Sequence, residues 1–126
     1  MSFDVFFQRF RDGEGDPGGG EQMRRVLAPH IVQEEAANSF VRVGYGDGGA
    51  DIYLDSDNMM ANHISGEQTW DLLVQGALAA QWVILPAGCP TCLTDESQRA
   101  HLPEGLDLDV IVVRSGEELL HAIHSA

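Results

Sequence analysis

Lysine is absent from this 126-residue chain, and basic residues of any kind are scarce. Seven arginines face twenty aspartates and glutamates, so the formal net charge is −13 at neutral pH. A surface of that sign repels phosphate backbones and anionic lipid, which argues against nucleic acids and membranes as partners. It speeds encounters with basic surfaces, so we expect a basic protein partner.

Long hydrophobic runs are also absent. No stretch approaches the roughly 20 apolar residues that span a bilayer. The first residues, Met1 to Asp4, lack the basic segment and apolar segment of a secretory signal. We therefore expect a cytoplasmic protein. With 44% hydrophobic residues the chain can build one core, and its length predicts a single domain over residues 1–126.

Cysteine is limited to Cys89 and Cys92, too few for a disulfide framework. The segment Cys89-Pro90-Thr91-Cys92 resembles the redox site of thioredoxin-like proteins in following an apolar strand. It departs from that family in having proline first between the cysteines, and in coming after most of the predicted sheet. A zinc site needs at least three protein ligands, and His101 lies nine residues beyond Cys92. Cys89, Cys92 and His101 are thus candidate zinc ligands, while a tight turn with two free thiols is the favoured interpretation.

Catalytic motifs are missing from the rest of the chain. The glycines of 44–49 precede a predicted strand, whereas a phosphate cradle needs a helix there. There is no G-x-S-x-G nucleophile motif either. His63 is the histidine best placed to line a pocket with Trp70 or Trp82, although core packing explains the two tryptophans better. No catalytic residue is predicted, and a protein without enzymatic activity is favoured.

Hydrophobic periodicity predicts six strands and three helices in the order β-α-β-β-β-α-β-β-α. This is an α+β pattern, with a single mixed or mostly antiparallel sheet and about three helices packed on one face. The strands are expected at 3–10, 39–45, 50–54, 59–64, 81–86 and 109–114, and the helices at 21–30, at 65–80 and after residue 115.

Several local features refine this arrangement. Phe6 and Phe7 are adjacent, which predicts a first strand covered at least in part on both faces. The segments 11–20, 33–38 and 87–108 are expected to be connections, the first of them mobile because it contains five glycines, and the last with one possible helical turn at 95–100. Ser65 and Ser115 each stand three residues before a glutamine or glutamate, which predicts a capping box at two helix starts.

Acidic residues concentrate in the predicted turns and in the 11–20 loop. Solubility alone can explain a high net charge. The alternative is a surface complementary to a basic partner, since electrostatic steering raises association rates. On that hypothesis the candidate partner-binding residues are Asp12, Glu14, Asp16, Asp47, Asp51, Asp55 and Asp57.

Four features together resemble the small acidic immunity proteins of bacterial polymorphic toxin systems: the strand after Met1-Ser2, the helix with Trp70, the strand at 82–86 and the terminal helix after Ser115. The resemblance implies a non-enzymatic inhibitor that binds a cognate toxin, often a nuclease or another basic enzyme, and uses no cofactor. The two cysteines are not part of it, so a small zinc-binding or thiol-redox protein is the alternative. A homo-oligomer is possible but not indicated, and the strand order is left open.

Overall fold

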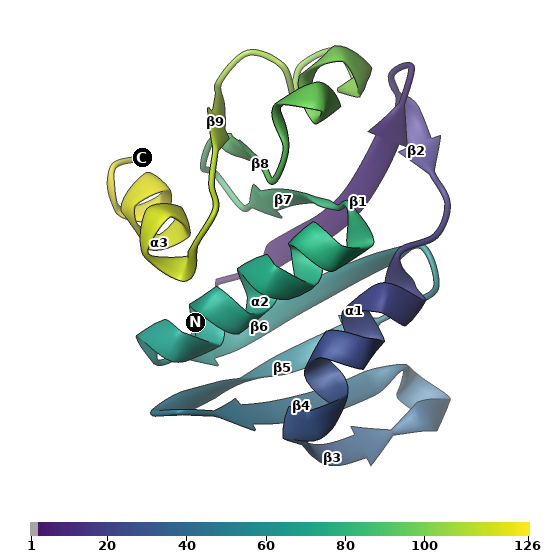
Figure 1. The fold of residues 1–126 in the computed structure, drawn as a ribbon, viewed down its shortest axis with the longest axis vertical. Helices are drawn as coiled ribbons and strands as arrows, with labels where there is room; N and C mark the ends of the chain where they lie inside the picture. The colour runs from purple at the N-terminus through teal and green to yellow at the C-terminus, as the bar shows by residue number, and fades with distance from the viewer. Residues whose placement is uncertain (1–2) are drawn as a thin grey trace.

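The computed structural model describes residues 3–126; Met1 and Ser2, which belong to the resemblance above, lie outside the described residues. Residues 3–126 form one mixed sheet with helices packed against it (Figure 1), so the predicted α+β class is confirmed. The strand order is β3-β4-β5-β6-β1-β7-β8-β9, and β2 pairs with β1 alone. Every pairing is antiparallel except that of β8 with β9. The nine strands of the described chain are β1 (Val5–Arg11), β2 (Glu14–Asp16), β3 (Ile31–Glu35), β4 (Phe40–Tyr45), β5 (Gly48–Leu54), β6 (Asn58–Ser65), β7 (Val83–Pro86), β8 (Thr91–Leu93) and β9 (Val110–Val112).

Three α-helices of residues 3–126 cover one face of the sheet, with α2 lying between α1 and α3 (Figure 1). α2 is buried on several sides because the sheet and both neighbouring helices pack against it, which explains why eight of its fourteen residues are buried. No helix formed by these residues has both the length and the apolar character needed to cross a membrane. The helices are α1 (Gly20–Leu27), α2 (Glu67–Ala80) and α3 (Gly116–His124), with three short 3-10 helices, η1 (Ala28–His30), η2 (Ala36–Asn38) and η3 (Glu96–His101).

The main core lies between the helices and the sheet. Phe7 of β1 and Trp82 before β7 are fully buried, with ring centroids 6.5 Å apart. The Trp82 indole N–H donates to the Gly18 carbonyl, so its one polar group is satisfied inside the core. Leu73 of α2 and Leu119 of α3 complete the contact of the helices with the strands.

A second, smaller core lies on the other face of β7 and β8. Ile84 and Cys92 point into the main core, whereas Val83 and Leu93 belong to the second cluster with Leu102. Successive side chains of a strand point to opposite faces, so this end of the sheet is covered on both sides. That double coverage accounts for the continuous apolar run at 81–86.

Three short strands were not predicted, and each falls in a segment expected to be a connection. The prediction of a mobile loop at 11–20 is wrong: Asp12 and Gly13 both have positive φ (51° and 83°), as a two-residue type I′ hairpin turn requires. This turn pairs β2 with the end of β1. β3 covers the first half of the connection at 33–38 and η2 the second half, and β8 lies within 87–108.

The two predicted capping boxes have different outcomes. Ser65 does not cap α2: it ends β6, its hydroxyl accepts from the Gly49 N–H, and Gly66 is the N-cap without a side-chain bond. Ser115 does cap α3, because its hydroxyl accepts from the Glu118 N–H at 3.1 Å. The Glu118 carboxylate accepts from the Arg114 N–H, one residue before the cap.

Candidate partner-binding face

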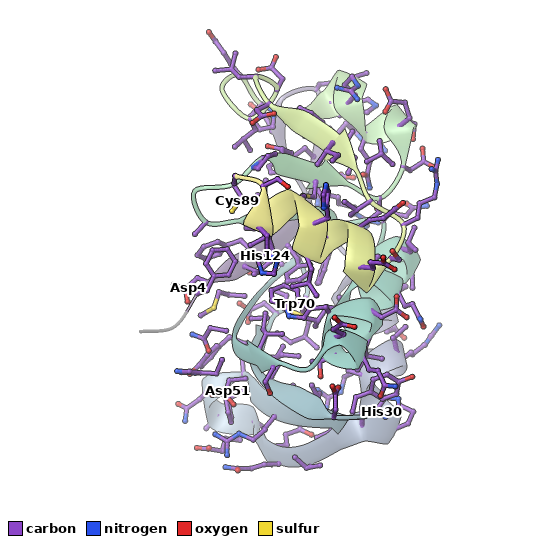
Figure 2. The ribbon with its side chains drawn as sticks, turned by 90° about the vertical axis from the view of Figure 1, so that its left-hand side faces the viewer. Asp4, His30, Asp51, Trp70, Cys89 and His124 are labelled. Carbon is purple, nitrogen blue, oxygen red and sulfur yellow. The ribbon has the colours of Figure 1, made fainter. Side chains whose placement is uncertain are left out.

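The far face of the sheet carries no helix over β1, β6, β5, β4 and β3. Figure 2 shows Asp4 and Asp51 on this side, opposite the helices and Trp70. Phe7 points into the core and is fully buried, while its neighbour Phe6 points outward and is 46% exposed. The prediction that both faces of the first strand are covered is therefore wrong where β1 pairs with β6. We call this surface the uncovered face.

An apolar row crosses the uncovered face at right angles to the strands. Phe6 pairs with Leu85 on one side and with Met60 on the other, Met60 pairs with Tyr53, and Tyr53 pairs with Phe40. The rings of Phe40 and Tyr53 are 5.2 Å apart. Side chains directly opposite on paired strands are in contact distance, so these five form a continuous strip. Phe6 and Tyr53 are its exposed members (46% and 41%), whereas Phe40 is only 8% exposed and Leu85 packs against the second core. We call it the aromatic row: Leu85, Phe6, Met60, Tyr53 and Phe40.

A shallow hollow of about 410 Å³ lies at the β3 end of the aromatic row. Phe40 and Tyr53 supply apolar surface, and the Arg42 guanidinium lies 5.7 Å from the centre of the Phe40 ring. Glu35 is the register partner of Phe40 and places a carboxylate at the rim. The hollow thus offers an apolar surface next to a negative charge.

A second row, parallel to the first, is polar and internally hydrogen-bonded. Asp51 of β5 accepts from Arg42 Nε at 2.8 Å, and this hydrogen bond raises the pKa of Arg42. Arg42 also donates to the Gln33 side chain, and the Asn62 amide donates to Asp4. The second oxygen of Asp51 lies 3.0 Å from His63 Nδ1. We call these residues the polar row: Asp4, Asn62, Asp51, Arg42 and Gln33.

His63 does not form a pocket with either tryptophan. It has a positive φ of 49°, next to the register shift between β5 and β6, and its ring lies on the uncovered face beside Asp51. Trp70 and Trp82 are buried in the main core on the helix side. The pocket hypothesis for His63 has no structural basis in this arrangement.

No protein-family model, curated protein or solved structure matches this chain.

The seven acidic residues singled out in the sequence do not gather in one place. Asp51 is on the uncovered face, and Asp47 lies in the β4–β5 turn. Asp55 and Asp57 belong to the β5–β6 turn, where the Asp57 carboxylate accepts from the Gly18 N–H at 2.8 Å. Asp12, Glu14 and Asp16 belong to the β1–β2 hairpin, with Asp16 beside Arg9 and Arg11 and Asp12 beside His101.

The sequence places each residue of the aromatic row in a predicted strand but does not show which face of the sheet stays open. The adjacency of Phe6 and Phe7 indicates an apolar side chain on each face of the first strand, since neighbouring side chains of a strand point to opposite faces. Tyr53, which is next to the fully buried Ile52, gives the same indication on β5.

Cys89 lies in the tight connection between β7 and β8 (Figure 2), whereas Cys92 is the middle residue of β8 itself. Cys89 is partly exposed, Cys92 is fully buried, and burial raises the pKa of the Cys92 thiol to about 12. His101 lies instead beside the β1–β2 turn, with Nδ1 3.5 Å from the Asp12 carboxylate. Within residues 3–126 no three His, Cys, Asp or Glu side chains come together as a metal site, so the zinc alternative has no third ligand there.

Proposed function

We propose that this chain is a non-enzymatic binding protein that docks a basic protein partner on its uncovered face, as an immunity-like inhibitor docks a toxin. The aromatic row is the observation that carries the proposal. Isolated apolar side chains on a protein surface need no explanation, but five in register across five strands form one strip. Aromatic side chains at the centre of a contact supply most of the binding energy in protein interfaces.

The charge distribution supports a basic partner. Among residues 3–126, five of the twenty carboxylates form an ion pair with an arginine, and six of the seven arginines take part. Most carboxylates of this described part of the chain therefore have no arginine as an ion-pair partner. A complementary positive surface would be steered toward it and would associate faster at low salt.

The hollow beside Glu35 suggests how one basic side chain would be held. An arginine of the partner can place its guanidinium against the Glu35 carboxylate and lay its stem along Tyr53 and Phe40. The Glu35 carboxylate accepts from the Gln33 and Asn38 amides at 3.1 and 3.5 Å, but Arg42 is engaged by Asp51, so no arginine of residues 3–126 forms an ion pair with Glu35. The aromatic row then continues the contact toward β1.

The test uses the protein encoded beside the gene for this chain. Binding is measured by calorimetry, and association by stopped flow at 50 and 500 mM NaCl. The double variant Phe6→Ser, Tyr53→Ser should weaken binding at least about 100-fold, since interface aromatics of this kind cost about 2 kcal/mol or more each. Val32→Ser, Leu108→Ser is the matched control, because both residues are exposed (68% and 86%) and lie outside the aromatic row. The control should bind like the wild type, and 500 mM NaCl should slow association at least about tenfold.

Co-expression gives a second readout, in which the chain rescues growth of cells that make the neighbouring protein and the double variant does not. Absence of any binding or rescue would contradict the inhibitor function. Equal affinities of the double variant and the wild type would contradict the assignment of the uncovered face.

A further inference from the structure

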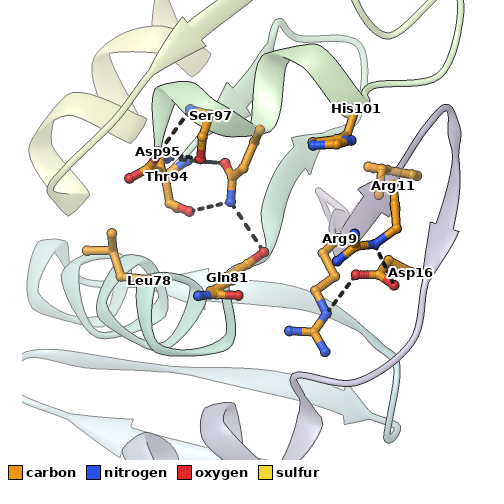
Figure 3. Close-up of a pocket in the computed structure, with 11 residues that line it drawn as sticks. Arg9, Arg11, Asp16, Leu78, Gln81, Thr94, Asp95, Ser97 and His101 are labelled. Carbon is orange, nitrogen blue, oxygen red and sulfur yellow. Dashed lines mark hydrogen bonds and ion pairs between the residues drawn. The ribbon is translucent and has the colours of Figure 1, made fainter.

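A separate hollow of about 390 Å³ lies between the β1–β2 hairpin, the end of α2 and η3 (Figure 3). Its size falls in the range of about 300–1,000 Å³ typical of small-molecule sites. Arg9, Arg11 and His101 all line it, although the chain has only seven arginines and five histidines. The hollow thus brings two arginines and a histidine together in a strongly acidic protein.

The carboxylates that line this hollow are already engaged. Asp16 is shared by Arg9 and Arg11, whose Nε atoms lie 3.6 and 3.8 Å from it. Asp95 accepts from both the N–H and the hydroxyl of Ser97, as the cap of η3. Asp16 is thus held between two arginines, whereas both bonds to Asp95 end on Oδ1 and its Oδ2 accepts no hydrogen bond within residues 3–126.

Two hydrogen-bond donors at the hollow have no acceptor among the described residues. Arg9 is held in place by the Pro17 carbonyl, but the Arg11 guanidinium makes no hydrogen bond to any residue of 3–126, and the Arg11 side chain is 71% exposed. The Asp12 N–H donates to His101 Nδ1 at 3.2 Å, so in the neutral ring Nδ1 is an acceptor and the proton resides on Nε2. His101 Nε2 is therefore a second donor, fixed in tautomer by the hairpin turn.

One wall of the hollow is apolar. Phe10 of β1 and Leu78 of α2 face the same space as the donors. A ligand that satisfies all these groups carries acceptor oxygens at one end and a small hydrocarbon or aromatic part at the other. Arginine favours oxyanions because its N–H groups match the geometry of carboxylate and phosphate.

From these contacts we propose that the hollow binds a small organic oxyanion, with its carboxylate or phosphate group on Arg11 and His101 and its apolar part against Phe10 and Leu78. This site is distinct from the uncovered face and stands independently of the proposed partner. Asp16, 3.8 Å from Arg11 Nε, positions the Arg11 side chain, and Arg9 is held by the Pro17 carbonyl.

The experiment titrates the full chain with inorganic phosphate, phenyl phosphate and benzoate at constant ionic strength, with sodium chloride as the reference salt. Arginine Nε–H and histidine ring resonances are followed by NMR. Phenyl phosphate or benzoate should give saturable shifts at Arg11 and His101, with tighter binding than inorganic phosphate because of the apolar wall. Saturation by phenyl phosphate alone would assign a phosphate ligand, and saturation by benzoate alone a carboxylate.

Arg11→Gln should weaken this binding at least tenfold. Arg25→Gln is the matched control: Arg25 is equally exposed (74%), contacts one carboxylate, and lies on α1 away from the hollow. Thermal unfolding of both variants verifies that the fold is retained. The proposal is overturned if none of the three anions saturates below 50 mM, or if Arg11→Gln and Arg25→Gln change the affinity equally.

Discussion

The two ends of the sheet differ in how their outward-facing side chains are covered. At the closed end, formed by β7, β8 and β9, Val83 and Leu93 point away from the helices yet are 1% and 0% exposed. At the open end, formed by β3 to β6 with β1, Phe6 and Tyr53 point the same way and are 46% and 41% exposed. Residues of similar chemistry thus stabilise the fold at one end and remain available for a partner at the other.

The largest expected contrast concerns the thiols of the closed end. In the single-thiol variant Cys89→Ser, the remaining Cys92 should react with maleimide more than about a thousandfold more slowly than in the unfolded chain, because it is reached only by unfolding. Its pKa of about 12 means that raising the pH to 9 forms little thiolate in the folded protein. In Cys92→Ser, the partly exposed Cys89 should react readily. Labelling is followed by mass spectrometry, and fast labelling of Cys92 would show that the closed end opens locally.

A mutation pair tests the comparison through stability. Leu93→Ala removes a fully buried side chain of the second core and should lower the free energy of unfolding by about 2–5 kcal/mol. Tyr53→Ala at the open end should cost about 1 kcal/mol, since 41% of Tyr53 is already exposed in the folded protein. Urea unfolding followed by circular dichroism measures both. Similar losses would mean that the aromatic row is needed for folding, which would weaken its assignment to a partner.

Much of the fold could be predicted from local patterns. The helices at 21–30 and 65–80 and the helix after Ser115 have apolar stripes of helical period, and all three are present. The β4–β5 hairpin followed from β-branched residues around the glycines at 46–49. These elements depend on interactions within a few residues, which the sequence carries directly.

The rest depends on contacts between distant segments. β3 and β8 are short strands whose sequences, Ile31–Glu35 and Thr91–Leu93, become strands only because β4 and β7 offer them pairing edges. Which face of a strand receives a helix is likewise decided by the chain path, so the aromatic row could not be separated from core residues. β2 is different: its Asp12-Gly13 turn is a recognised hairpin signal, and the high glycine content of 11–20 obscured it.

A buried hydroxyl at the closed end gives a smaller expected effect. Thr94 Oγ1 donates to the Trp82 carbonyl at 3.1 Å and accepts from the Gln98 amide. Thr94→Val keeps the volume but removes the donor to the Trp82 carbonyl and one of the two acceptors of the Gln98 amide, so it should cost about 1–3 kcal/mol. Ser65→Ala is the control at the open end, where water can replace the exposed hydroxyl that accepts from Gly49. A loss for Ser65→Ala equal to that for Thr94→Val would contradict the difference between the two ends.

The smallest expected effect is the pH dependence of the N-terminal cap of η3. This short helix lines the hollow between the β1–β2 hairpin and the end of α2. Hydrogen bonds from the Ser97 hydroxyl and N–H lower the pKa of Asp95 below its ordinary value of 3.8. A carboxyl whose pKa is lower in the folded state stabilises the fold above pH 3.8, and this stabilisation is lost as the pH falls through the lower folded value. Asp95→Asn keeps a capping side chain without the charge. The variant should therefore be less stable than the wild type at pH 6, and the difference should shrink as the pH falls below 3.8 in urea unfolding experiments. Ser97→Ala removes the main cause of the shift and should reduce this pH dependence, whereas a constant difference between pH 6 and pH 2 would show that the carboxylate charge contributes nothing to the cap.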